Sequence, residues 1–178
     1  AAAIAASGWK WLLGPTGTGR LYTTPRLRKK LSLVFAGAET MRQGADYLNH
    51  SWDPHESGKF FEYSTPHFAL AAALHTCLTE VTLRYGVAAI NKEIIRLQDI
   101  LLEQSPRARK NALLFPEDSR SGILALYLEN PEPVARGLRE AGVVVRERSH
   151  FLRLSPHVFN SDEQMERTAQ LLEELLPA

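Results

Sequence analysis

The stretch SGWKWLLGPTGTG occupies residues 7–19 and decides the fold prediction. A single lysine, Lys10, stands between Trp9 and Trp11, and three glycines follow within residues 14–19. Bulky aromatic neighbours at a chain bend are expected to shield a lysine amine from water, which lowers its pKa and leaves more of it neutral. A neutral amine can form a Schiff base with a carbonyl compound. The glycines allow positive φ and close approach of the backbone to another group.

The same stretch resembles the cofactor-lysine segment of class V aminotransferase-like enzymes, which reads approximately G-Y/H-K-W-L-x-G-P-x-G-x-G-x-L-Y. Trp9 stands where many members of that family have His. The resemblance implies pyridoxal phosphate as the cofactor, Lys10 as the residue that forms a Schiff base with it, and Ser7 as a phosphate contact. The matching positions are Ser7, Lys10, Trp11, Leu12, Gly14, Pro15, Gly17, Gly19, Leu21 and Tyr22.

A second segment, FEYST at residues 61–65, resembles the F-E-x-G-T segment of the same family, with Ser64 in place of the usual Gly. In the family this Thr gives its hydroxyl to the cofactor phosphate, commonly across a dimer interface, so the resemblance implies Thr65 as a cofactor-binding residue. Thr65 and Pro66 also fit the N-cap and first position of a helix. Both interpretations can hold, because a helix N-terminus favours an anion.

Two segments near the C-terminus extend the resemblance. RSGI at residues 120–123 matches the family's R-S-G-I, and LRLSPHVFN at residues 152–160 is similar to its L-R-I-S-P-x-x-Y-N, with Phe159 in place of Tyr. In the family the Arg of the latter segment binds the substrate α-carboxylate, which implies that role for Arg153. A planar guanidinium can hold a carboxylate through two parallel hydrogen bonds.

The chain has 178 residues, enough for one sizeable core or two small ones. Enzymes of the resembling family are about twice as long, with the lysine near the middle. The predicted fold class is therefore α/β, the second half of a pyridoxal-phosphate-dependent transferase fold. Residues 1–104 would be part of the large cofactor-binding domain, and residues 105–178 a small α+β C-terminal domain. The family's ring-stacking residue and the Asp that pairs with the pyridinium nitrogen come from the other half.

Local patterns predict the secondary structure. Apolar residues at steps of three and four predict a helix that ends at Gly86 and another over 87–101. A short helix is expected after Asn130, and Ser161 with Gln164 fits a capping box for the last helix. Residues 32–60 look irregular, and Cys77 falls inside the first helix. Strands are expected at the end of residues 1–7, where the strand should be buried, and at 19–24, 122–128, 143–146 and 151–155.

Composition narrows the class of partner. The net charge of +1 gives no broad attraction to nucleic acid or membrane, and no run of about 18 apolar residues predicts a membrane span. The single cysteine excludes an intrachain disulfide and fits a cytoplasmic protein. His50, Asp53, His55 and Glu56 lack a recognised metal-ligand spacing, so they are interpreted as a polar loop, with no metal site.

Two functional hypotheses follow. The first is a pyridoxal-phosphate enzyme acting on an amino acid, as an aminotransferase, epimerase or C–S lyase, which needs the missing N-terminal half and forms a homodimer as its family does. Cysteine desulfurases of the family need a reactive Cys in the loop before R-S-G-I. Residues 107–119 contain none, which disfavours persulfide-forming desulfuration. The second hypothesis is a non-catalytic interaction or structural module that keeps the second half of the fold.

Overall fold

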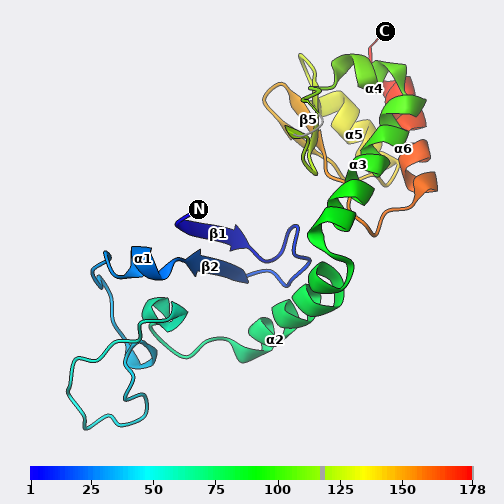
Figure 1. The fold of residues 1–178 in the computed structure, drawn as a ribbon. Helices are drawn as coiled ribbons and strands as arrows, with labels where there is room; N and C mark the ends of the chain where they lie inside the picture. The colour runs from blue at the N-terminus through cyan, green and yellow to red at the C-terminus, as the bar shows by residue number, and fades with distance from the viewer. Residues whose placement is uncertain (117–118, 178) are drawn as a thin grey trace. The chain divides into compact units, whose positions relative to one another are not determined.

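The computed structural model describes residues 1–116 and 119–177. Contacts along the chain divide it into two compact units, Ala1–Arg84 and Tyr85–Ala178. Figure 1 shows the elements of both units along the chain. The two units are described one after the other.

The first unit begins with a β-hairpin. Strand β1 (Ala3–Ser7) pairs antiparallel with β2 (Gly19–Thr23), and Ser7 lies opposite Gly19. These two strands form the whole sheet, so their apolar side chains stay exposed, with 48% exposure at Ile4 and 52% at Leu21. The strands were predicted, but the prediction that the first one is buried is wrong, because a two-stranded sheet has no layer packed on it within this unit.

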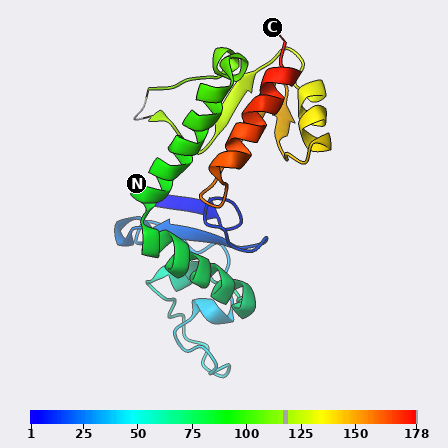
Figure 2. The same ribbon diagram turned by 90° about the vertical axis from the view of Figure 1, so that its right-hand side faces the viewer.

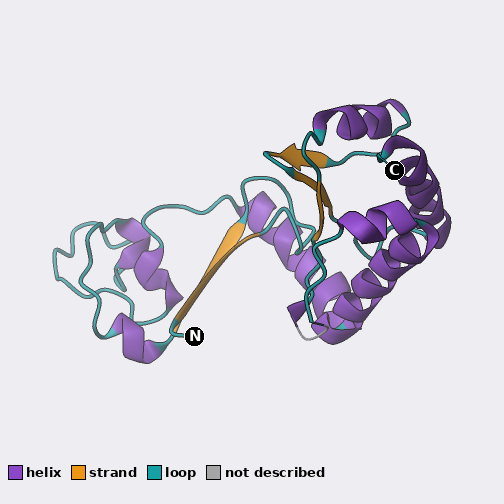
Figure 3. Cartoon of the chain, turned by 90° about the horizontal axis from the view of Figure 1, so that it is seen from above, coloured by secondary structure: helices purple, strands orange, loops and turns teal. Residues whose placement is uncertain are grey.

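Polar contacts hold the long segment that follows. It contains helix α1 (Pro25–Arg28) and the short 3₁₀ helices η1 (Ala38–Thr40) and η2 (Gly58–Phe61), and is otherwise loop, as Figure 3 shows. The fully buried Thr40 donates its hydroxyl to the Glu62 carbonyl at 2.8 Å and accepts from the Gly37 amide at 3.1 Å. The predicted irregular structure is confirmed, and a hydroxyl rather than apolar packing lies at its centre.

Helix α2 (Phe68–Cys77) continues into the π-helical segment η3 (Leu78–Leu83). The ring Nδ1 of His67 accepts the Leu70 amide at 3.4 Å and caps the helix. The prediction that Thr65 and Pro66 form the cap and first position is therefore wrong, because the imidazole of His67 satisfies the free amide. Gly86, with φ of +81°, ends the helical stretch as predicted.

The second unit contains a three-stranded antiparallel sheet in the order β3-β5-β4. Its strands are β3 (Leu124–Tyr127), β4 (Arg146–Arg148) and β5 (Phe151–Leu154). Along β5, Leu152 and Leu154 are buried while Phe151 and Arg153 are exposed. One face of the sheet therefore belongs to the core, and the other is open.

The described part of this unit also contains four α-helices: α3 (Val87–Gln104), α4 (Pro106–Asn111), α5 (Glu132–Glu140) and α6 (Asp162–Leu175). Helices α3 and α6 lie side by side (Figure 2). The predicted capping box of Ser161 and Gln164 begins α6. No helix in the described part of the chain is both long and apolar enough to cross a membrane. The core gathers side chains from all four helices and from the sheet, among them Leu101, Ala108, Leu126, Leu138, Leu152 and Leu172.

The other predicted strands are shorter by one to three residues than expected, and two boundaries differ for reasons that the structure shows. The strand expected over 143–146 begins only at Arg146, because its partner β5 ends at Leu154 and Pro156, just beyond, has no N–H to donate. The contact division falls between Arg84 and Tyr85 rather than after residue 104, because α3 packs on α6. The assignment of residues 1–104 to a cofactor-binding domain and 105–178 to a small C-terminal domain stays a prediction.

The two units differ sharply in apolar burial. Leu74 is the one buried hydrophobic residue of Ala1–Arg84, all of which the structure describes, whereas the second unit holds the whole core cluster. Because apolar burial is the dominant favourable term in folding, we expect residues 85–178, expressed alone, to unfold cooperatively in urea. Residues 1–84 alone should show no cooperative transition by circular dichroism. A cooperative transition of 1–84 would contradict this difference.

An ion cluster joins α3 to α6. Arg96 Nη2 lies 2.6 Å from Asp162 Oδ1 and 2.7 Å from Glu93 Oε1. The hydrogen bonds from Arg96 lower the pKa of the Asp162 carboxyl below its usual value. A carboxyl whose pKa is lowered by folding adds stability above its unfolded-state pKa, and this stability is lost as the pH falls through the folded-state pKa.

We therefore expect Asp162→Asn to lower the urea midpoint at neutral pH, and the gap to the wild type to close as the pH falls toward about 2. Circular dichroism over this pH range measures both proteins. Glu174→Gln, which removes an exposed acid of the same helix, should follow the wild-type curve. A gap that keeps its size across the whole range would refute the role of the carboxylate charge.

Candidate functional site

Residues 8–18, here called the lysine loop, connect β1 to β2 and carry Lys10. The Gly8 amide donates to the Thr18 carbonyl at 2.8 Å, which extends the hairpin ladder by one step. The Gly14 amide donates back to the Gly8 carbonyl at 2.8 Å, and the Leu13 amide to the Lys10 carbonyl at 3.0 Å. Lys10 therefore lies in a small backbone loop that these hydrogen bonds close. They fix the position of its Cα and the direction of its Cα–Cβ bond.

The Lys10 side chain is exposed, and so are its neighbours Trp9 at 45% and Trp11 at 39%. The predicted shielding of the amine by these two rings is wrong for this chain. The reason is that the loop is the tip of a two-stranded hairpin with one layer of neighbours. The exposed amine is open to a carbonyl compound that approaches from solvent.

Two glycines let the loop close tightly. A Cβ added to Gly8, which is buried, would lie 2.2 Å from Thr18 Oγ1 and 3.0 Å from Thr18 Cβ. A Cβ added to Gly14 would lie 2.6 Å from Leu74 Cδ1 and 3.0 Å from the Gly8 carbonyl oxygen. The predicted need for close backbone approach is confirmed at these two positions.

Cys77 ties the lysine loop to helix α2. Its half-buried thiol donates to the Leu13 carbonyl, with Sγ and oxygen 3.2 Å apart. Leu13 has a φ of +57°, the left-handed region that a leucine seldom adopts. Cys77 is the last residue of α2, as predicted for a cysteine within that helix, and its thiol holds the carbonyl of the left-handed Leu13.

A pocket of about 420 Å³ lies between the end of the lysine loop and α2. Ser7 and Thr65 are each adjacent to a residue of its wall, since Ser7 is the ladder partner of Gly19 and Thr65 directly precedes Pro66. Neither Ser7, Lys10 nor Thr65 lines it directly. Its walls are formed by Gly17, Thr18, Gly19, Pro66, His67, Leu70, Ala71, Leu74, His75 and Leu78.

Arg153 lies in the second unit, on the open face of its sheet. It stands on the central strand β5, between Ala125 of β3 and Arg146 of β4. The next row of the same face holds Tyr127 and Phe151, whose rings meet edge to face with centroids 5.7 Å apart. The structure thus gives Arg153 an arginine neighbour that the sequence analysis missed. The signal was present, because Arg146 and Arg153 are equally distant from the Ser149–His150 turn.

Glu147, between Arg146 and Arg148 on β4, is paired away from this face. Glu147 alternates to the core side of β4, where its carboxylate lies 2.9 Å from Arg139 Nη1. Its pKa is lowered, first by a hydrogen bond from its own backbone amide and then by the charge of Arg139. The carboxylate therefore stays ionised in the pair with Arg139.

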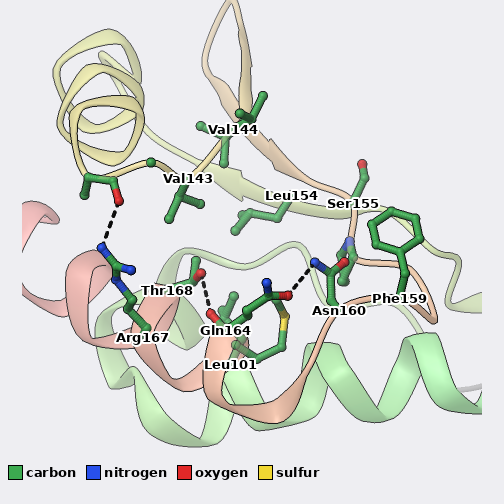
Figure 4. Close-up of a pocket in the computed structure, with 15 residues that line it drawn as sticks. Leu101, Val143, Val144, Leu154, Ser155, Phe159, Asn160, Gln164, Arg167 and Thr168 are labelled. Atoms are coloured by element: carbon green, nitrogen blue, oxygen red, sulfur yellow. Dashed lines mark hydrogen bonds between the residues drawn. The ribbon is translucent and has the colours of Figure 1, made fainter.

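A second pocket, of about 420 Å³, lies on the core side of β5, where Leu154 and Ser155 line it (Figure 4). Its rim is held by Arg167, which donates to the Ala141 carbonyl at 3.0 Å, and by Asn160, which donates to Gln164 Oε1 at 3.0 Å. Val143 and Leu154 supply apolar wall. None of the residues predicted from the sequence to form the site lines this pocket.

Comparison with known protein families identifies one family that matches the chain. The sequence profile of the aminotransferase class-V family matches residues 2–167. No curated protein sequence matches the chain significantly.

Solved structures resemble the chain over nearly its whole length. One is a complex of the cystine C-S lyase C-DES with its reaction product cysteine persulfide, at 19% identity and a TM-score of 0.81, covering 96% of this chain and 46% of that one. Another is a lysine-to-alanine mutant of C-DES with glycine covalently linked to the PLP cofactor, at 18% identity and a TM-score of 0.82, covering 95% and 45%. A third is the cysteine desulfurase CsdA (S-sulfonic acid) from Escherichia coli, at 20% and 0.71, covering 97% and 46%.

These likenesses confirm the predicted fold class, α/β and part of the pyridoxal-phosphate-dependent transferase fold. The chain spans less than half the length of the structures that it matches. At this level of identity the likeness shows the fold alone.

The closure of the lysine loop can be tested at Gly8. We expect Gly8→Ala to loosen the lysine loop, because the new methyl group collides with Thr18. The loop amides of residues 8, 13 and 14, which are hydrogen-bonded, should then exchange their hydrogens about tenfold faster in the full chain. The matched control is Gly58→Ala, whose methyl group meets nothing within 4 Å. Equal exchange rates of these amides in the two variants would contradict the tight closure.

Proposed function

Because the chain belongs to the aminotransferase class-V family, we propose that it forms part of a pyridoxal-phosphate-dependent enzyme that acts on an amino acid. In this proposal Lys10 forms the Schiff base with the cofactor. The observation that carries the proposal is the lysine loop, which presents one exposed amine from a backbone ring fixed by three hydrogen bonds.

The residues of the first unit fit the cofactor. The end of the lysine loop and the start of α2 border a common pocket, and Ser7 and Thr65 are each adjacent to a residue of its wall. We assign Ser7 and Thr65 to the cofactor phosphate. The N-terminus of α2 adds backbone dipoles that favour an anion. Members of the family use pyridoxal phosphate, as the sequence predicted.

When bound, pyridoxal phosphate supplies an electron sink for the carbanion at the amino acid's Cα. With the cofactor bound, Lys10 Nζ would be the base that removes the proton from the amino acid's Cα. Arg153 would hold the substrate carboxylate by two hydrogen bonds and so orient the Cα–H bond. The geometry of the second unit supports this role, because the Arg153 side chain is exposed on the open face of the sheet.

The proposal includes a requirement for the other half of the fold. The chain spans less than half of its structural neighbours, and its first unit buries a single hydrophobic residue. The exposed side chains of the hairpin, such as Ile4, Leu21 and Tyr22, offer the surface that such a half would cover. It would also supply the ring-stacking residue and the Asp for the pyridinium nitrogen, which the family resemblance implies.

The proposal keeps three reaction types for this enzyme: transamination, epimerisation and C–S cleavage. Residues 107–119 contain no Cys, which disfavours a desulfurase that stores a persulfide; of these, 117–118 lie outside the described residues. A homodimer in the cytoplasm is part of the proposal and rests on the family resemblance and on the single cysteine.

The direct test is the visible absorbance of the purified chain mixed with pyridoxal phosphate. It is measured for the chain alone and for the chain co-expressed with a polypeptide that supplies the N-terminal half of this fold. We expect a Schiff-base band that Lys10→Ala abolishes, because the exposed amine is the reacting group. The matched control is Lys30→Ala, which removes another exposed lysine of the same unit and should leave the band unchanged.

A band that appears only in the co-expressed pair would support the requirement for the second half. A band of equal strength in the wild type and in Lys10→Ala would overturn the assignment. If neither sample gives a band that depends on Lys10, the enzyme proposal fails and the alternative, a non-catalytic interaction or structural module of the same fold, takes its place.

A further inference from the structure

Three arginines stand on the open face of the sheet β3-β5-β4. Arg146 lies directly opposite Arg153, and Arg148 lies directly opposite Phe151. Directly opposite residues of an antiparallel pair have Cβ atoms about 5 Å apart and project from the same face. All three arginines are exposed, so this face, here called the arginine face, carries three positive charges in two adjacent rows.

Within the described residues, the side chains of Arg146, Arg148 and Arg153 make no ion pair and no hydrogen bond. The acid between two of them in the sequence, Glu147, alternates to the other side of the sheet and is paired with Arg139 at 2.9 Å. The charge of Arg146 acts on Glu147 more weakly than that of Arg139. Several other arginines of this unit are paired, as Arg96 is with Asp162 and Arg120 with Asp99.

Like charges placed directly opposite each other destabilise a sheet. Two arginines in register with no acid between them therefore cost stability that a bound anion would recover. The row also has room for a ligand, because the residue on the other side of Arg153 is the small Ala125. Beside it, the rings of Tyr127 and Phe151 provide an apolar wall for a short carbon chain.

We propose that Arg146 is a second substrate-binding residue that acts together with Arg153, and that the substrate is an amino acid with a second acidic group. This inference rests on the proposed function, in which Arg153 binds the α-carboxylate. Arg146 then binds the acidic group of the side chain. A dianion neutralises both guanidiniums, whereas a monocarboxylate leaves one of them without a counter-charge.

The test uses two bare probes, glutarate with two carboxylates and butyrate with one. Binding to the full chain is followed by the shifts of arginine Nε–Hε resonances at low ionic strength, where exposed charges are least screened. We expect glutarate to bind about tenfold more tightly than butyrate, the effect of one further charge-assisted hydrogen-bonded pair. Arg146→Gln should reduce the affinity for glutarate to about that of the same variant for butyrate, so that the preference for glutarate is lost.

The control is Arg136→Gln, which removes the same charge from an arginine of α5 that is paired with Glu132 and should keep the preference for glutarate. Arg146→Lys should retain part of the preference, since it keeps the charge but loses the planar fork. Urea midpoints of all variants check that they fold. Equal affinities for the two probes in the wild type, or a preference that survives Arg146→Gln, would overturn the inference.

This test separates the inference from the proposed function, because the probes contain no amine and the measurement needs no cofactor. A dicarboxylate site without a Schiff base at Lys10 would leave the arginine face as an anion site and remove its link to the enzyme. A Schiff base at Lys10 with no preference for glutarate would keep the enzyme and exclude an acidic substrate held by Arg146.

Discussion

The register of β5 against its two neighbours is the constraint on which the second unit depends. Because the strand is central, its alternation sends Leu152 and Leu154 into the core and Arg153 to the open face. A shift of one residue would bury the arginine and expose both leucines. The same register that closes the core therefore determines that a guanidinium stands on the open face.

The first unit is held by backbone contacts and not by an apolar core. Its lysine loop is held by backbone hydrogen bonds and by two glycines that admit no methyl group, while apolar burial is almost absent. Such a unit has a defined local geometry but little driving force of its own. Its exposed hairpin is consistent with a part that completes its packing against further polypeptide, as the length of its structural neighbours suggests.

Sequence patterns predicted what depends on neighbours along the chain. The capping box at Ser161, the helix end at Gly86 and the strand that begins at Phe151 are local features, and the structure confirms them. Features that depend on distant partners were mispredicted or missed. The exposure of Lys10 depends on which layers cover the hairpin, and the start of β4 depends on Pro156. The pairing of Arg146 with Arg153 could have been predicted only by placing the turn at Ser149–His150 and counting the same number of residues along each strand.

The central claim is that Lys10 is the amine that pyridoxal phosphate modifies. The most direct measurement is borohydride reduction of the chain with the cofactor, followed by peptide mass spectrometry that quantifies the adduct at every lysine. The account predicts that Lys10 is labelled far above Lys29, Lys30 and Lys59, which are also exposed. Labelling spread evenly over these lysines would contradict it, because exposure alone would then explain the reaction.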